Sequence, residues 1–399
     1  MKIKIKKSIL KNGLILLTDK DNSNIINISL YVKAGQRHGN KQLAHFVEHM
    51  VFTGTKKREQ SEIIGEIEGL GGKINASTNL YSTRYSITVP KHGIDTAIDI
   101  LSNMVQNSEF KKEMVDKERN ILVNELLENK DEIVDDMCEL IEKTMFEEHP
   151  SLGKDDPEFV RNVSREELLD FYRSYYVPNN MLLTISGNFK GIINKVKKAF
   201  NQKPSKIPLI KDLTLKAQQN NIELRIRKKT NICTIAMAYK TVDRLNEDSN
   251  ALRLISAYLG KGATSKLFTE LRLKRSLLYS FDVDNETETN YGIFTFIASA
   301  DKKDIPEIKR LFLNEINELK NMTVECLNKA KNKLIGSYLT YSEDKKTRFI
   351  EATFEELYNA KGYFTNAVED ISSVTLKDVK RVAERYFNHY TCIVLEQKG

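Results

Sequence analysis

One sequence pattern occurs twice in the 399-residue chain, and this repeat is the strongest limit on the folds that the chain can adopt. Residues 163–176 recur as residues 374–387. Each copy begins with a Ser or Thr that has an acidic residue three positions later, which is typical of a helix N-terminus, and an apolar run follows the helix. Residues 24–33 and 231–240 form a second matched pair with the pattern of buried strands. The repeat therefore predicts two equivalent units that combine helices and strands.

The predicted fold class is α+β, with two homologous repeats that each consist of a mainly antiparallel sheet packed with helices. A chain of this length exceeds the size at which one hydrophobic core is usual, so two cores are expected. Residues 201–221 are polar, contain two prolines and lack a sustained apolar face, which is typical of a connection between domains. The predicted domains are therefore residues 1–205 and residues 222–399, joined by a linker at residues 206–221.

Composition and charge disfavour several classes of function. Hydrophobic residues make up 40% and charged residues 29% of the chain, as in soluble globular proteins. No segment approaches the roughly 18 apolar residues that span a bilayer, and residues 11–13 interrupt the first apolar stretch before it reaches signal-peptide length. The net charge of +7 arises from 62 basic and 55 acidic residues that are interspersed, which disfavours nucleic acid as a partner. The four cysteines form no CxxC pair, so a cytoplasmic location without membrane insertion is expected.

The motif HFVEH at residues 45–49 is the clearest chemical signal. Residues 41–53 have helical character, so His45 and His49 share one helix face about one turn apart, the spacing that suits two ligands of one tetrahedral Zn²⁺. Glu48 can then reach the water in the open zinc position, take its proton and later deliver a proton to a leaving amine. The alternative is that the two histidines are simply packed or surface residues. It is disfavoured, because the chain has only six histidines and two of them show this spacing with a Glu between them.

A catalytic zinc site usually has three protein ligands, so one more ligand must come from elsewhere in the chain. The helical stretch at residues 117–129 offers carboxylates. Glu118 and Glu125 are seven residues apart and share a face, whereas Glu128 and Glu132 can lie on that face or on the solvated side. Spacing alone leaves the third ligand open. The metal itself is also open at this point, since histidine and carboxylate ligands accept cobalt and manganese as well as zinc.

Three segments carry a resemblance to a known family. They are the HFVEH motif with the residues that follow it to Thr55, GGKINAST at residues 71–78, and ERNILVNE at residues 118–125. Together they resemble the pitrilysin and insulin-degrading-enzyme family, which includes mitochondrial processing peptidase and uses HxxEH as an inverted zinc signature. The resemblance covers nearly the whole chain. It implies one Zn²⁺ per chain, with Glu125 as the third ligand and Glu118 as a carboxylate that supports the site.

The second unit resembles the same family at residues 275–280, RSLLYS, which are similar to its Arg-Gly-Leu-x-Tyr segment. The resemblance implies that Arg275 and Tyr279 contact the substrate carbonyl and the transition state, and both side chains can donate hydrogen bonds to an oxyanion. Ser276 departs from the usual Gly of this segment, and Gln42 departs from a Gly often seen just before the metal helix. The second unit has no zinc motif, so only the first is expected to bind metal.

The resemblance implies a zinc metalloendopeptidase that cleaves unfolded peptides or presequences. The two repeats together are expected to form half of a clam-shell chamber. Because the chain is about half as long as the four-domain members of the family, we expect a homodimer to complete the chamber, with a heterodimer containing a family-like subunit as the alternative.

The peptide substrate is expected to pair with an edge strand at residues 73–78, because the polar residues there leave backbone groups available. The substrate-binding residues would then be Ile74, Asn75, Ala76 and Ser77. Two other functions stay open: a non-catalytic scaffold subunit, against which the intact Glu48 argues, and a peptide or nucleic-acid binding module.

Overall fold

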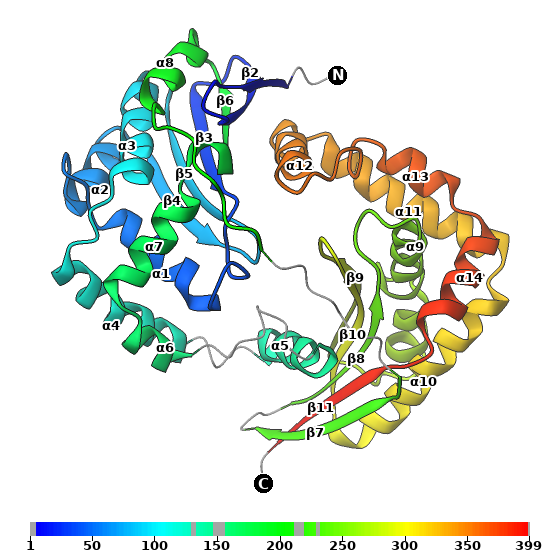
Figure 1. The fold of residues 1–399 in the computed structure, drawn as a ribbon. Coiled ribbons are helices and arrows are strands. Elements are labelled where there is room, and N and C mark those ends of the chain that lie inside the picture. The colour runs from blue at the N-terminus through cyan, green and yellow to red at the C-terminus, as the bar shows by residue number, and fades with distance from the viewer. Residues whose placement is uncertain (1–4, 129–132, 147–155, 211–218, 229–231, 398–399) are drawn as a thin grey trace. The chain divides into compact units, whose positions relative to one another are not determined.

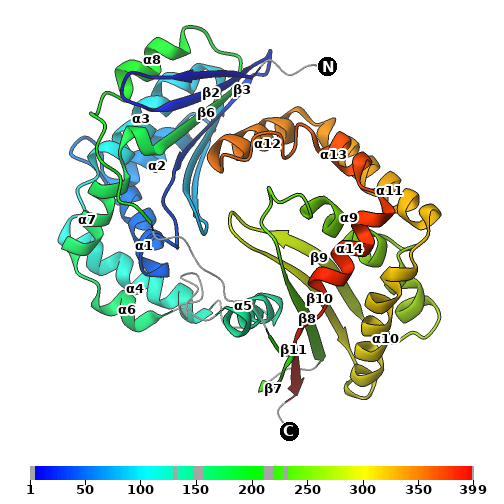
Figure 2. The same ribbon diagram turned by 45° about the vertical axis from the view of Figure 1, so that its right-hand side comes forward.

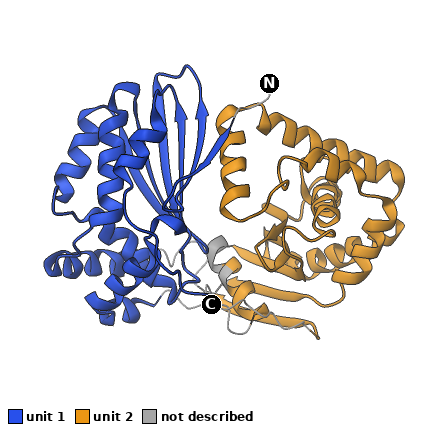
Figure 3. Cartoon of the chain, turned by 45° about the horizontal axis from the view of Figure 1, so that its top comes forward, with its two compact units in different colours: residues 1–132, 149–211 blue, residues 133–148, 212–399 orange. Residues whose placement is uncertain are grey.

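The computed structural model describes residues 5–128, 133–146, 156–210, 219–228 and 232–397. The chain divides into two compact units, shown in different colours in Figure 3. Unit 1 comprises residues 1–132 and 149–211, and unit 2 comprises residues 133–148 and 212–399. Each unit combines one sheet with helices, which confirms the predicted α+β fold with two repeats. No helix within the described residues is long and apolar enough to cross a membrane.

Unit 1 contains a six-stranded sheet in the order β1-β2-β6-β3-β5-β4 (Figure 1). Its strands are β1 (Lys6–Ile9), β2 (Ile15–Lys20), β3 (Ile25–Val32), β4 (Lys73–Thr78), β5 (Thr83–Pro90) and β6 (Met181–Gly187). All neighbouring strands are antiparallel except β2 and β6, which are parallel. This order leaves β4 at one edge of the sheet, as expected for a strand to which a peptide can be added.

The helices of unit 1 are α1 (Lys41–Phe52), α2 (Gln60–Gly69), α3 (Ile94–Asn107), α4 (Lys112–Glu128), α6 (Pro157–Asn162), α7 (Arg165–Tyr175) and α8 (Ile192–Ala199). Their caps follow from the sequence: the Ser164 side chain accepts from the backbone of Glu167, and the Glu167 side chain accepts from the backbone of Ser164. Two backbone N–H groups at the helix N-terminus, which have no partner within the helix, are hydrogen-bonded in this way. The cap predicted for the repeated helix is therefore present.

Unit 2 contains a five-stranded sheet in the order β7-β11-β8-β10-β9, in which only β7 and β11 are parallel. Its strands are β7 (Ile222–Lys228), β8 (Cys233–Thr241), β9 (Ser280–Thr287), β10 (Gly292–Ala300) and β11 (Thr391–Gln397). Its helices are α5 (Ile133–Met145), α9 (Ser249–Gly260), α10 (Ile305–Glu318), α11 (Val324–Ser342), α12 (Lys345–Leu357), α13 (Ala367–Ser373) and α14 (Leu376–Tyr386), with a π-helical turn at Phe268–Leu273. Figure 2 shows α10 and α14 running beside each other on this unit.

Helix α5 belongs to a different unit from the one predicted, because the predicted ranges placed residues 1–205 in one domain. It belongs to unit 2 and contacts β8 and β11. Just after α5, the ring of Phe146 lies 5.0 Å from the ring of Tyr291, and the Lys240 ammonium lies 5.3 Å from the Phe146 ring. Burial of this apolar helix face against the sheet of unit 2 explains the assignment, which sequence proximity does not reveal.

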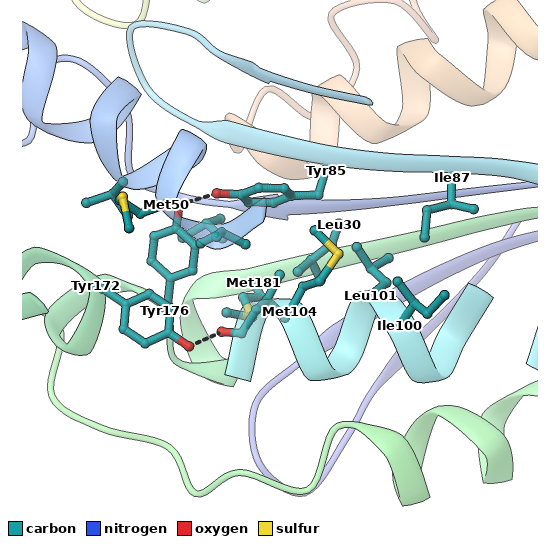
Figure 4. Packing of buried hydrophobic residues seen from close by; sticks show 14 of the residues in the cluster. Leu30, Met50, Tyr85, Ile87, Ile100, Leu101, Met104, Tyr172, Tyr176 and Met181 are labelled. Atoms are coloured by element: carbon teal, nitrogen blue, oxygen red, sulfur yellow. Dashed lines mark hydrogen bonds between the residues drawn. The ribbon is translucent and has the colours of Figure 1, made fainter. Parts of the chain in front are cut away.

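Three tyrosines organise the core of unit 1 (Figure 4). The hydroxyls of Tyr85 and Tyr176 lie 2.7 Å apart in a hydrogen bond, and Tyr176 is 1% exposed. The Tyr172 hydroxyl donates to the backbone oxygen of Val105 at 3.0 Å. The rings fill the space between α7, α3 and the sheet while their polar ends are satisfied, as buried tyrosines require.

Candidate metal centre

Helix α1 carries the HFVEH motif, and its regular start sets the orientation of both histidines. Asn40 caps the helix, because its side-chain oxygen accepts from the backbone N–H of Gln42 at 2.9 Å. Gln42, which stands where the family often has Gly, is buried in the helix without a left-handed backbone. The rings of His45 and His49 lie 4.9 Å apart on one face, with side chains 23% and 19% exposed. The predicted shared face is therefore present.

Helix α4 packs on α1 and brings Glu125 to both histidines. The Nε2 atom of His45 lies 3.7 Å from Glu125 Oε1, and the Nε2 atom of His49 lies 3.6 Å from Glu125 Oε2. One ligand atom from each of the three residues lies within 4.8 Å of the others. Of the alternative carboxylates, Glu132 and the side chain of Glu128 lie outside the described residues.

The donor group fits zinc. Ligand atoms at about 2.0–2.2 Å from one Zn²⁺ in tetrahedral geometry lie about 3.4 Å apart. The two measured separations of 3.6 and 3.7 Å are close to this value. Two imidazole nitrogens and one carboxylate oxygen also leave a fourth position for water, as in catalytic zinc sites.

Glu118 contacts the opposite side of His49. Its Oε2 atom lies 3.1 Å from His49 Nδ1, and the residue is only 5% exposed. Burial by itself lowers the pKa of His49, but the hydrogen bond to Glu118 and the carboxylates of Glu48, Glu118 and Glu125 raise that pKa above its usual value. The Nδ1 contact directs Nε2 of His49 toward Glu125, the orientation that a metal ligand requires.

Glu48 lies beside the histidines and is 8% exposed. Burial raises the pKa of its carboxyl, and the charge of Glu125 adds to this rise, while the Thr78 hydrogen bond and His49 oppose it. The Thr78 hydroxyl donates to Glu48 Oε2 at 2.5 Å. A carboxyl with a raised pKa and a fixed orientation suits general acid–base chemistry. Thr78 was not predicted as a site residue, although its position at the end of the GGKINAST segment is a signal in the sequence.

A cavity of about 510 Å³ opens next to Glu48 and His49. Its walls come from α1, α2, α4 and β4, and include Phe52, Gln60, Ile64, Ile74, Asn75 and Ala76. Three of the four substrate-binding residues predicted on β4 therefore line it, and Ser77 is not among the lining residues. The sequence did not predict that residues of α2 would line this cavity, because no periodic pattern links that helix to the HFVEH motif.

Arg275 and Tyr279 lie in unit 2 and bind acidic side chains there. Arg275 Nη1 donates to Glu270 Oε2 at 2.8 Å, and the Tyr279 hydroxyl donates to Asp301 Oδ1 at 2.7 Å. Tyr279 is 59% exposed. Between them, Ser276 adopts a φ of +53°, the left-handed conformation that explains why a Gly is usual at this position. Their role as substrate contacts stays a prediction.

Comparison with known proteins matches both units to family models. The model described as "Insulinase (Peptidase family M16)" matches residues 14–153, and the model described as "Peptidase M16 inactive domain" matches residues 162–334. An uncharacterized zinc protease of Rickettsia felis is 26% identical over 96% of this chain and 95% of its own length. A probable mitochondrial-processing peptidase subunit beta of Arabidopsis thaliana is 25% identical over 94% of this chain and 75% of its own length.

Solved structures show the same fold. The crystal structure of a protease from Helicobacter pylori superposes with a TM-score of 0.87 at 22% identity, covering 99% of this chain and 100% of that one. The α+β repeats, the histidine–glutamate group and the relatives named as zinc proteases define a zinc metallopeptidase. The chain belongs to the insulinase family, peptidase family M16, which confirms the resemblance found in its motifs.

Proposed function

We propose that the chain cleaves internal bonds of unfolded peptides or presequences, with one Zn²⁺ held by His45, His49 and Glu125. The observation that carries this proposal is the group of three ligand atoms within 4.8 Å beside Glu48. A catalytic site needs both a metal-binding group and an acid–base group, and these four side chains provide both. The relatives named as zinc proteases support the reaction class.

The side chains divide the chemistry between them. When bound, Zn²⁺ supplies a Lewis acid that lowers the pKa of water and polarises a carbonyl. The Glu48 carboxylate is placed to hold the proton of an attacking water and to pass it to the leaving amine. Thr78 holds this carboxylate in one orientation through the 2.5 Å hydrogen bond, and Glu118 orients the ring of His49. No covalent intermediate is required.

The edge strand β4 is the proposed binding site for the peptide backbone. It pairs with β5 on one side and ends the sheet order, so its other side can pair with a substrate strand. Its last residue, Thr78, contacts Glu48, so a peptide aligned on β4 would be led to the acid–base group. The adjoining cavity of about 510 Å³ offers room for one substrate side chain.

Arg275 and Tyr279 are proposed to donate hydrogen bonds to the substrate carbonyl and to the oxyanion that develops on it. Their exposure and donor chemistry support this role. Each now donates to a carboxylate, Glu270 or Asp301, so substrate binding must replace these contacts. An oxyanion is a strong acceptor in a site that excludes water, which favours the exchange.

We also propose a homodimer as the active assembly, because a two-repeat chain would supply half of an enclosed chamber. A heterodimer is the alternative, supported by the relative whose name describes it as a subunit. A cytoplasmic location is proposed because the four cysteines form no CxxC pair, a pattern that suits a reducing compartment.

Glu48→Gln tests the proposed function. The variant keeps the shape of the side chain but cannot take a proton, so turnover of a quenched fluorescent peptide library should fall by orders of magnitude while zinc content is unchanged. Glu113→Gln, an exposed position on α4, is the matched control and should remain active. Equal cleavage by wild type and Glu48→Gln would contradict the proposal. Zinc binding without any cleavage by the wild type would favour a scaffold subunit.

A further inference from the structure

A series of hydroxyl groups leads from Glu48 into the core of unit 1. It begins at Thr78, whose hydroxyl donates to Glu48 Oε2 at 2.5 Å. Thr83 faces Thr78 across the β4–β5 pair, and their hydroxyl oxygens lie 3.4 Å apart. The Thr83 hydroxyl also donates to the backbone oxygen of Ala34 at 2.9 Å. The proposed peptidase chemistry gives no role to Thr83.

Two tyrosines extend this series. Burial raises the pKa of Tyr176 above its usual value, whereas its hydrogen bonds with Tyr85 and Thr83 act in the opposite direction. The hydroxyls of Tyr176 and Tyr85 lie 2.7 Å apart (Figure 4). Thr83 and Tyr85 are 0% exposed and Tyr176 is 1% exposed. Because bulk water does not reach these three hydroxyls, they depend on protein partners for their hydrogen bonds.

The number of hydrogens gives the series one direction. Each hydroxyl has a single hydrogen, and an ionised carboxylate can only accept. Thr78 uses its hydrogen for Glu48, so Thr83 must be the donor in the 3.4 Å contact. Tyr176 must then donate to Thr83, and Tyr85 must donate to Tyr176. All four hydroxyls therefore donate toward the Glu48 carboxylate, and hydrogen bonds aligned in this way strengthen one another.

Backbone contacts hold the acceptor of Thr83 in place. The loop between β3 and α1 runs against the turn between β4 and β5, where the Gln36 N–H donates to Asn79 O at 3.0 Å. A Cβ atom at Gly35 would lie only 2.1 Å from that oxygen, so the two backbones are in direct contact. The same loop leads into α1, which carries the acid–base group. The bond from Thr83 to Ala34 therefore ties the end of β4 to the start of α1.

We propose that Thr83 and Tyr176 are positioning residues, which hold Thr78 so that its hydroxyl fixes the orientation of Glu48. The inference rests on the proposed peptidase function. Both side chains are buried and act through Thr78. Loss of the Thr83 hydroxyl removes the donor to Thr78 and the tie to the loop before α1, so the carboxylate is less well placed for the attacking water. Misplacement of a reacting group lowers turnover.

Thr83→Val replaces the hydroxyl by a methyl group of similar size. In the zinc-loaded full chain, we expect kcat for a peptide that the wild type cleaves to fall about tenfold, with KM changed by less than about twofold. Thr83→Ser keeps the hydroxyl and should retain the wild-type kcat. Thr184→Val is the matched control, because the Thr184 hydroxyl is also buried in this sheet and donates to Ser29 O at 3.2 Å. It should keep the wild-type kcat.

Tyr176→Phe and Tyr172→Phe form a second matched pair, which decides the question if Thr83→Val does not fold. The two rings lie 5.0 Å apart in the same core. The Tyr172 hydroxyl donates to Val105 O and takes no part in the series that ends at Glu48. Tyr176→Phe should therefore lower kcat, by less than Thr83→Val because its hydroxyl is further from the carboxylate, and Tyr172→Phe should not.

Crystal structures of the zinc-free proteins test the same inference without activity. The 2.5 Å contact between Thr78 and Glu48 should be lost in Thr83→Val and kept in Thr184→Val. A retained contact in Thr83→Val would overturn the proposal, and so would equal values of kcat in Thr83→Val and Thr184→Val. If the wild type cleaves no peptide, the proposed function fails, and the contact seen in the crystals then decides the positioning role by itself.

Discussion

Carboxylates are the most buried of the charged side chains at the candidate metal centre. Glu118 is 5% and Glu48 is 8% exposed, and each has a specific partner, His49 for Glu118 and Thr78 for Glu48. A buried carboxylate without such partners would be strongly destabilising, so these contacts make the burial possible. The same contacts orient the groups that the proposed chemistry uses. At the scale of single residues, the site therefore depends on hydrogen-bonded pairs of side chains and not on isolated ones.

Loss of Glu118 should weaken metal binding without removing a ligand. Glu118→Ala deletes the partner of His49 Nδ1 and should lower zinc affinity by about 10–100-fold, whereas Glu118→Gln keeps an acceptor and should have a smaller effect. Competition with a zinc chelator measures both affinities, and Glu113→Gln is the control on the same helix. Wild-type affinity in Glu118→Ala would show that the contact does not support the site.

The left-handed backbone at Ser276 gives a second prediction at this scale. A non-glycine residue at a φ of +53° is strained, so Ser276→Gly should stabilise unit 2 by about 0.5–1 kcal/mol, while Ser276→Ala should not. Urea unfolding of the three proteins measures the difference. A Ser276→Gly variant that is less stable than Ser276→Ala would indicate that the serine side chain, and not the backbone, matters here.

At the scale of elements, unit 2 joins α9 to α14 through one buried acid. Asp248 precedes α9 and is 0% exposed. It accepts from the Tyr386 hydroxyl at 2.7 Å and pairs with Arg381 at 2.6 Å and Arg385 at 3.3 Å, all from α14. Burial would raise the pKa of Asp248, but the contacts with Arg381 and Tyr386 and the two arginine charges outweigh it and hold that pKa below its usual value. The acid therefore stabilises unit 2 only in its charged form.

Asp248→Asn should accordingly destabilise unit 2 in a pH-dependent manner. At neutral pH we expect a loss of about 1–2 kcal/mol, because Arg381 and Arg385 lose the charge of their buried partner but are themselves partly exposed to water. The folded-state pKa is lowered, so this stability is present above the unfolded pKa of about 3.9 and is lost as the pH falls through the folded value. Urea unfolding at pH 7 and at decreasing pH below 4 should show the difference between wild type and variant shrink. Glu369→Gln, at an exposed position of α13, should give no such trend.

The edge position of β4 gives another prediction for an element. Proline at Ile74 removes a backbone donor and restrains the strand, so Ile74→Pro should weaken peptide cleavage if substrate adds to β4. Ser8→Pro in β1, the opposite edge of the same sheet, is the matched control. The comparison requires that both variants keep wild-type helix and strand content by circular dichroism. Unchanged cleavage kinetics in a folded Ile74→Pro protein would remove β4 as the substrate strand.

At the scale of the whole molecule, two similar units have diverged in what they can do. Unit 1 has two histidines on α1, whereas α9 of unit 2 contains no histidine. Each unit has a separate hydrophobic core, so the chain can unfold in more than one step. A chain that carries both the zinc motif and the predicted oxyanion donors does not need a second type of subunit for chemistry.

A homodimer is therefore expected in solution. Light scattering on the pure protein should give twice the mass of one chain, and the peptidase activity should elute with that species. A stable and fully active monomer would contradict the dimer. An inactive protein that binds zinc and gains activity with a family-like partner would support the heterodimer instead.

Local spacing in the sequence determined the features that depend on a few neighbouring residues. The HFVEH motif puts its histidines on one face whatever surrounds the helix, because four residues make about one turn. The cap at Ser164 and the two α+β repeats were likewise predicted and are confirmed. The motif resemblance led to the correct family, since metal chemistry tolerates little change in spacing.

Only the tertiary structure decided which distant residues meet. It brings Glu125 to within 3.7 Å of His45 and joins Thr78 to Glu48, contacts that helical spacing left open or missed. It assigns α5 to unit 2, where that helix contacts β8 and β11. These outcomes depend on how separate segments bury their apolar faces together. That packing is a property of the whole folded chain and is not encoded in any short stretch of it.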